Sequence, residues 1–249
     1  MDRFNNIFVH PKDVGEASNL FLQLSEKIYS IQEKHVPGKS KVPDARRMGL
    51  MNCYQFITTN IFMMNIVNKV SKGILPPKVF TEIIDLEEGD LRKVMEDMFL
   101  MTKMSIVPLF QFQIENMLRN ILLHLDPEAS VVSYYKICEK LIHSITINDK
   151  EELITCLQIP AKIRNSLHSN GIYKRMSPKE PEIAKYYLEG VEFKFENGKG
   201  INCAGSGHIY LSFDKTLDIV DGILDSPEVS SIKTEIKDQW AWENKGLLV

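Results

Sequence analysis

Residues 109–125 read LFQFQIENMLRNILLHL, and this stretch decides the fold class of the chain. Its apolar residues recur at the three- and four-residue spacing of an amphipathic helix, and Asp126-Pro127 ends the pattern. One acidic residue, Glu115, lies within the apolar stripe, and Arg119 is its natural ion-pair partner one turn further along. The stretch therefore predicts one long helix of a mainly helical protein.

Helical spacing continues on both sides of this stretch. Asp44 is a good N-cap for a helix that ends before Gly73. Pro108 should kink or split the helix in which it lies, and Pro160 suits the first turn of a new helix because its missing N–H is harmless there. Helices are predicted over about 12–34, 44–71, 90–125, 131–144 and 150–158, with a short helix beginning at Pro160.

The pattern changes after Pro181. Residues 191–203, VEFKFENGKGINC, alternate apolar and charged side chains and then reach Asn197-Gly198, which predicts a β-hairpin with its turn there. Residues 208–213, HIYLSF, favour a further strand, and helical spacing returns near Leu217. The predicted fold is mainly α, a helical bundle with an N-terminal helical extension and a small C-terminal β-hairpin. Its segments are 1–88, 89–190 and 191–249.

Composition restricts the possible functions. The chain has 249 residues and a net charge of −3, so it has no overall electrostatic attraction to nucleic acid, and any RNA site must be a local basic pocket. No apolar run is long enough for a signal peptide or a membrane span, which predicts a soluble, cytoplasmic protein without a membrane partner. The glycine cluster NGKGINCAGSG has the wrong order for a nucleotide-binding loop. Four widely separated cysteines without a CxxC pair predict reduced thiols: Cys53, Cys138, Cys156 and Cys203.

The chemistry-bearing stretch is PAKIRNSLHSNGIY, residues 160–173. Arg164 and His168 are four residues apart and so lie on one face of a helix, while Asn170-Gly171 places His168 in its last turn. An arginine fork can hold phosphate oxygens and a histidine can transfer a proton, which together suit phosphodiester chemistry. Only one histidine and no carboxylate cluster lie in the stretch, so no metal or other cofactor is expected. The alternative is a helix end with a dipole-compensating histidine and an arginine that is solvated or salt-bridged.

IRNSLHSNGIY resembles the motif of HEPN domains, all-helical modules of prokaryotic toxins, abortive-infection and other defence proteins. The likeness covers about residues 90–173, with Glu115 in an earlier helix as in the family. The resemblance implies a metal-independent endoribonuclease, a toxin or phage-defence effector that acts on RNA as a homodimer with a composite site. The roles that it implies are Arg164 as phosphate clamp, His168 as acid and base, Asn165 as a polar orienter, and Glu115, Ser169 and Asn170 as supporting residues.

The spacing of the motif leaves alternatives open. Arg164 and His168 enclose three residues, whereas the family usually has four to six. Arg119 and His124 enclose four, but five positions turn a helix by about 140°, so their side chains diverge and we interpret that pair as structural. The alternatives are a catalytically inactive HEPN-like binding or regulatory module, and an unrelated helical interaction protein. A neutralising partner protein is a further expectation of the toxin hypothesis.

Overall fold

The computed structural model describes residues 14–36, 44–76, 78, 79, 82, 88–130, 133–175, 177, 178 and 180–238. The chain is mainly helical with one small sheet, as the sequence predicts. The elements are α2 (Val14–His35), α3 (Ala45–Ser71), α5 (Glu88–Leu125), α6 (Tyr134–Ser144), α7 (Lys150–His168), β1 (Ile183–Leu188), β2 (Val191–Glu196), α8 (Ser206–Asp225) and α9 (Pro227–Ser230).

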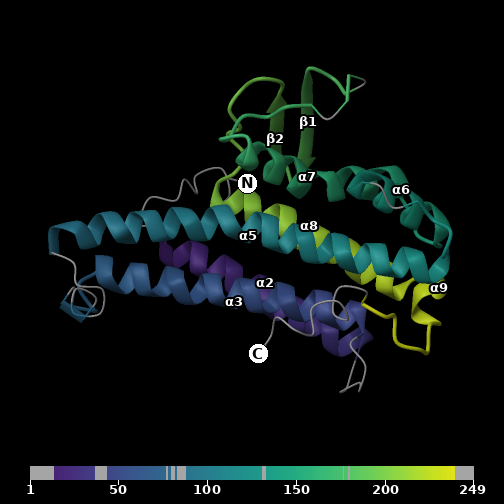
Figure 1. The fold of residues 1–249 in the computed structure, drawn as a ribbon, viewed down its shortest axis with the longest axis horizontal. Coiled ribbons are helices and arrows are strands. Elements are labelled where there is room, and N and C mark those ends of the chain that lie inside the picture. Colours follow the sequence, from purple (N-terminus) through teal and green to yellow (C-terminus); the bar gives the residue numbers. More distant parts are fainter. Residues whose placement is uncertain are drawn as a thin grey trace.

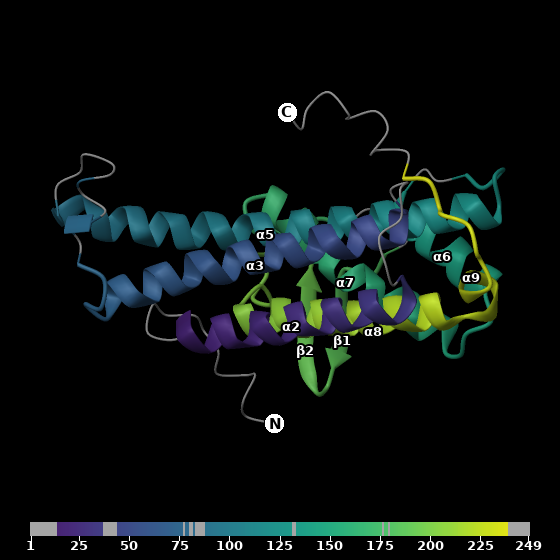
Figure 2. The same ribbon diagram turned by 90° about the horizontal axis from the view of Figure 1, so that it is seen from below.

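Helices α2, α3, α5 and α8 run along the length of the molecule (Figure 1). Helix α3 packs against both α2 and α5, and α2 packs against α8. Figure 2 shows that α3 and α5 extend together beyond the ends of α2 and α8. Helices α6 and α7 lie on α5, α7 also contacts α8, and the β-hairpin projects from that side. The end of α7 is thus held between two elements, α5 and α8, that are far from it in sequence.

One hydrophobic core holds these helices together and includes buried residues from Val14 to Ile236. Phe110 of α5 and Phe213 of α8 stack with their ring centroids 3.8 Å apart and their planes 12° from parallel. Helices α3 and α5 approach closely at Gly49, where an added Cβ would lie 2.9 Å from the Cβ of Met117. The predicted segments 1–88, 89–190 and 191–249 all contribute side chains to this core.

The predicted N-cap of α3 is confirmed. The Asp44 carboxylate accepts hydrogen bonds from the backbone N–H groups of Arg46 and Arg47, and from that of Ile236 near the other end of the chain. It also pairs with the Arg46 guanidinium, whose Nη2 is 2.7 Å from Oδ2. Burial alone would raise the pKa of Asp44, but these hydrogen bonds and the Arg46 charge outweigh it and hold the pKa below its ordinary value. Asp44 therefore joins α3 to the segment that follows α9.

The structure corrects two predictions that rest on proline, a split of the helix at Pro108 and a separate helix that begins at Pro160. Helix α5 runs from Glu88 to Leu125 without a break at Pro108, and α7 runs from Lys150 to His168 through Pro160. A proline inside a helix removes one hydrogen bond, yet burial of the flanking side chains offsets that cost. Ile159 and Ile163 of α7 are fully buried, and so are Val107 and Phe110 of α5. The motif therefore lies at the end of a 19-residue helix, not on a separate short one.

The hairpin is present, but its turn lies elsewhere than predicted. Strand β2 is the predicted 191–196 strand, and its antiparallel partner is the preceding strand β1, with Leu188 opposite Val191. The turn is at Glu189-Gly190, where both residues have positive φ, and Asn197-Gly198 follows β2 instead. The prediction of a strand at 208–213 was wrong: these residues belong to α8, whose buried side chains recur at helical spacing. That longer pattern outweighs the β propensity of a six-residue segment.

Candidate functional site

The last turn of α7 ends as the motif predicts. The backbone N–H of Gly171 donates to the carbonyl of Ser166 at 2.8 Å, and both Asn170 and Gly171 have positive φ, 56° and 80°. This left-handed turn closes the helix just after His168. Ser169 is the C-cap, and its backbone N–H donates to the carbonyl of Ser166. Asn170 is exposed. Ser169 and Asn170 thus belong to the turn that terminates α7.

Arg164 is held by acceptors from two helices. Its Nη1 lies 3.5 Å from Oε2 of Glu115 on α5, and its Nε donates to Oδ1 of Asn165 at 3.1 Å. Glu115 does approach Arg164 across the α5–α7 contact, at the separation of a weak ion pair. The other carboxylate oxygen of Glu115 accepts from Nη2 of Arg119 at 2.7 Å. One carboxylate thus bridges two guanidinium groups, which leaves a net positive charge at this contact.

His168 lies one turn beyond Arg164 on the same face of α7, and its side chain is exposed. It makes no hydrogen bond or ion pair within the part of the chain that the structure describes. Arg164 and Asn165 are half-buried. The surface therefore pairs a fixed, permanently charged guanidinium with an accessible imidazole. The catalytic roles of Arg164, Asn165 and His168 remain predictions.

The alternative pair, Arg119 and His124, has the geometry of a structural pair. Arg119 is bound to Glu115 one turn back, as the sequence predicts. His124 is exposed in the last turn of α5, where a basic residue is favoured by the helix dipole. The guanidinium of Arg119 nevertheless contributes charge to the surface near Arg164, through their shared partner.

The sequence did not predict that Lys162, next to the motif, is buried and bound to other side chains. Lys162, with 9% of its surface exposed, donates from Nζ to the Tyr173 hydroxyl at 3.1 Å and lies 3.3 Å from Oε1 of Glu180. The Tyr173 hydroxyl donates to the other oxygen of Glu180 at 2.8 Å. Burial and the Glu180 carboxylate raise the pKa of Tyr173. This triad ties the segment after the turn back to α7, and only Lys162 on an otherwise apolar face hints at it in the sequence.

A histidine and two carboxylates also gather between α2 and α8. One ligand atom from each of His35, Asp221 and Asp225 lies within 4.8 Å of the others. The Lys34 ammonium, however, already binds both carboxylates, and His35 Nε2 is 2.6 Å from Asp221 Oδ1. Lys34 supplies the positive charge that a metal ion would bring, so we interpret the cluster as an ion-pair network that fastens α2 to α8.

The four cysteines are free and buried, in agreement with the reduced thiols predicted from their spacing. Burial raises the pKa of Cys138 and of Cys203 to about 12. A thiol with so high a pKa is a poor nucleophile, and these cysteines serve the core.

The chain was compared with family models, curated proteins and solved structures. None of them matches. Among the described helices, none has the length and apolar character needed to cross a membrane. The HEPN resemblance of the motif therefore stays a prediction.

Proposed function

We propose that the chain is a HEPN-like, metal-independent endoribonuclease whose site is the exposed face of the last two turns of α7. One observation carries the proposal: Arg164 is fixed from behind by Glu115 and Asn165, and His168 is exposed one turn further along the same face. The two acceptors use Nε and Nη1, and Nη2 has no partner among the described residues. A phosphate can accept from that free edge of the guanidinium without displacing its supports.

The chemistry follows from the two residue types. A histidine removes the proton of the ribose 2′-OH, the oxygen attacks the adjacent phosphorus, and the bond from phosphorus to the 5′ oxygen breaks. A second acid gives a proton to that 5′ oxygen, so the products are a 2′,3′-cyclic phosphate and a 5′-hydroxyl. The guanidinium of Arg164 stabilises the charge that develops on the phosphorane oxygens.

One chain supplies one histidine at this surface, whereas the reaction uses a base and an acid. A two-fold dimer would place the partner subunit's His168 opposite the first, and would also double the local positive charge in a chain that is acidic overall. The proposed site is therefore composite. A neutralising partner would act by covering the same face.

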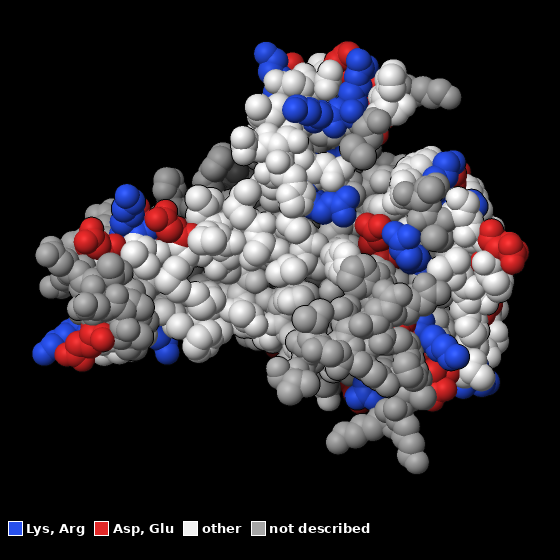
Figure 3. Space-filling model, viewed as in Figure 1, with Lys and Arg blue, Asp and Glu red and all other residues white. Residues whose placement is uncertain are grey.

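Helix α5 offers the surface for such a dimer. Met101, with 71% of its surface exposed, and Phe112, with 42%, lie 11 residues apart and so within about 20° on the helix. Glu115 follows on nearly the same face, which brings the apolar stripe up to Arg164. In Figure 3, which looks onto α5, a broad stretch without charged side chains runs along the middle of the molecule. Exposed apolar stripes of this kind favour self-association.

The test is cleavage of mixed RNA by the purified protein in EDTA. His168→Ala and Arg164→Ala should each lower the rate at least about 100-fold, the usual contribution of an acid–base or charge-stabilising group. His124→Ala is the matched control, because it makes the same change at another exposed histidine in the last turn of a helix. Equal cleavage by all variants, or no cleavage by the wild-type dimer, would leave the stretch as a helix end or a binding surface.

A further inference from the structure

A cavity lies apart from the motif, where α2 and α8 end and α3 begins. Its volume is about 500 Å³, and its walls come from these three helices, from α9 and from residues 232–235. That size is typical of pockets for small molecules. The cavity shares no residue with the Arg164–His168 surface, so a ligand could bind here whether or not the chain is a ribonuclease.

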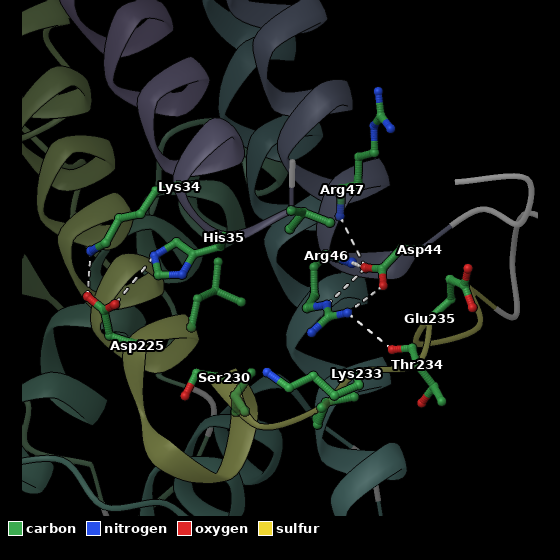
Figure 4. Close-up of a pocket in the computed structure, with 14 residues that line it drawn as sticks. Lys34, His35, Asp44, Arg46, Arg47, Asp225, Ser230, Lys233, Thr234 and Glu235 are labelled. Atoms are coloured by element: carbon green, nitrogen blue, oxygen red, sulfur yellow. Dashed lines mark hydrogen bonds and ion pairs between the residues drawn. The ribbon is translucent and has the colours of Figure 1, made fainter. Parts of the chain in front are cut away.

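Arg46 brings unused hydrogen-bond donors to this cavity. It is only 9% exposed, and its Nε and Nη2 groups are bound to the Asp44 carboxylate. Nη2 also donates to the carbonyl of Thr234 at 3.3 Å. The remaining nitrogen, Nη1, has no partner among the described residues. Figure 4 shows this free end of the guanidinium directed into the cavity.

Lys233 faces Arg46 across the same space. Its ammonium points into the cavity in Figure 4 and has no partner among the described residues. The other lysine of the lining, Lys34, is held by Asp221 and Asp225. Two cationic hydrogen-bond donors thus point into the cavity (Figure 4). The Arg46 guanidinium is buried and held by Asp44, whereas Lys233 is exposed.

The rest of the lining defines the kind of ligand. Four cations and three carboxylates line the cavity, so its formal charge is +1 without the histidine: Lys34, Arg46, Arg47 and Lys233 against Asp44, Asp225 and Glu235. Four apolar residues, termed the apolar wall, also line the cavity: Val36, Leu224, Val229 and Ile232. A ligand that matches both parts has an anionic head and an uncharged organic body.

We propose that this cavity binds a small phosphorylated molecule, with its phosphate between Arg46 and Lys233 and its body against the apolar wall. The backbone N–H groups at the start of α3 are already taken by Asp44 and Ile236, so the phosphate is held by side chains. Phosphate suits the pair because an arginine fork and a lysine point charge can bind different oxygens of one group.

Isothermal titration of the full chain with AMP, inorganic phosphate and adenosine tests the site. AMP should bind, and adenosine should bind at least about tenfold more weakly, because it lacks the charge-assisted hydrogen bonds. Lys233→Gln should weaken AMP binding by about tenfold or more. Lys237→Gln is the matched control, since Lys237 is exposed on the same segment but does not line the cavity, and it should leave the affinity unchanged.

A second test changes Arg46 but keeps a positive charge at that position. Arg46→Lys removes the fork and should weaken AMP binding, with circular dichroism to verify that the chain is folded. Three results would overturn the proposal: neither AMP nor phosphate binds at millimolar concentration, Lys233→Gln binds AMP as the wild type does, or a short RNA binds at Lys233 while AMP does not.

Discussion

Asp44→Asn is the sharpest test of how the start of α3 is joined to the segment that follows α9. The Asp44 carboxylate is 3% exposed and accepts from three backbone N–H groups and from the Arg46 guanidinium. Asparagine is also a good N-cap, so the substitution keeps the cap of α3 and removes the charge. Its amide group would in addition present N–H groups to donors, either Arg46 or Ile236.

The expected loss is about 3 kcal/mol of unfolding free energy, near the lower limit for breaking a buried ion pair, because Arg46 keeps the Thr234 carbonyl. Urea denaturation measures it, with Asp126→Asn as control. The Asp126 side chain is exposed and accepts a single hydrogen bond from its own turn, so that change should cost under about 0.5 kcal/mol. A loss at Asp44 no larger than that of the control would refute the reasoning.

The pH dependence adds a second condition. The pKa of Asp44 is lowered in the folded chain, from an ordinary value of 3.8, so its stabilisation is fully present above that value and is lost as the pH falls through the folded pKa. The difference between wild type and Asp44→Asn should therefore be constant from neutral pH down to about pH 5 and should shrink below about pH 4. A difference that grows on acidification would contradict the assigned ion pair.

Three further changes test the packing and the motif. Gly49→Val should destabilise the fold by about 2 kcal/mol or more in urea, because a Cβ there collides with Met117, while Gly200→Val meets open space and should cost far less. Lys162→Met should cost about 1–3 kcal/mol, since Glu180 loses its cation, and pairing it with Glu180→Gln in a double-mutant cycle should reveal the coupling. Glu115→Gln should lower RNA cleavage about tenfold by loosening Arg164, whereas a rate equal to wild type would make Glu115 a purely structural residue.

The helices were predictable because the pattern of burial is local. An apolar stripe specifies α2, α3, α5 and the part of α8 from about Leu217, and Asp44 marks where α3 begins. The first turns of α8 were predicted as a strand instead. The predicted helix boundaries at Pro108 and Pro160 were wrong because the proline rule is also local. A rule about one missing N–H near Pro160 says nothing about the buried side chains on either side of it, and those decide whether the helix continues.

The candidate sites were predictable in part. The Arg164–His168 face follows from four-residue spacing, and the pairing of Glu115 with Arg119 follows from the same spacing. The approach of Glu115 to Arg164 was an expectation from the HEPN resemblance. The Lys162–Glu180 contact spans 18 residues across a turn. Arg46 and Lys233 line one cavity because the start of α3 is bonded to Ile236, in the segment after α9. No local sequence pattern predicts these long-range arrangements, because each depends on how several elements pack together.

Arg164 and Arg46 differ in a way that separates their proposed roles. Both are braced by a carboxylate and both keep one nitrogen of the guanidinium without a partner among the described residues. One turn from Arg164 on the same face of α7 lies His168, an exposed residue of the type that transfers protons in catalysis. Arg46 and Lys233 line a cavity with an apolar wall that suits a small molecule. The first neighbourhood can therefore support proton transfer during phosphodiester cleavage. In the second, Arg46 and Lys233 can hold a phosphate, and the histidine of the lining, His35, is already bound to Asp221. Loss of RNA cleavage on changing His168, together with unchanged AMP binding, would be the clearest evidence that the chain keeps chemistry and ligand recognition at separate places.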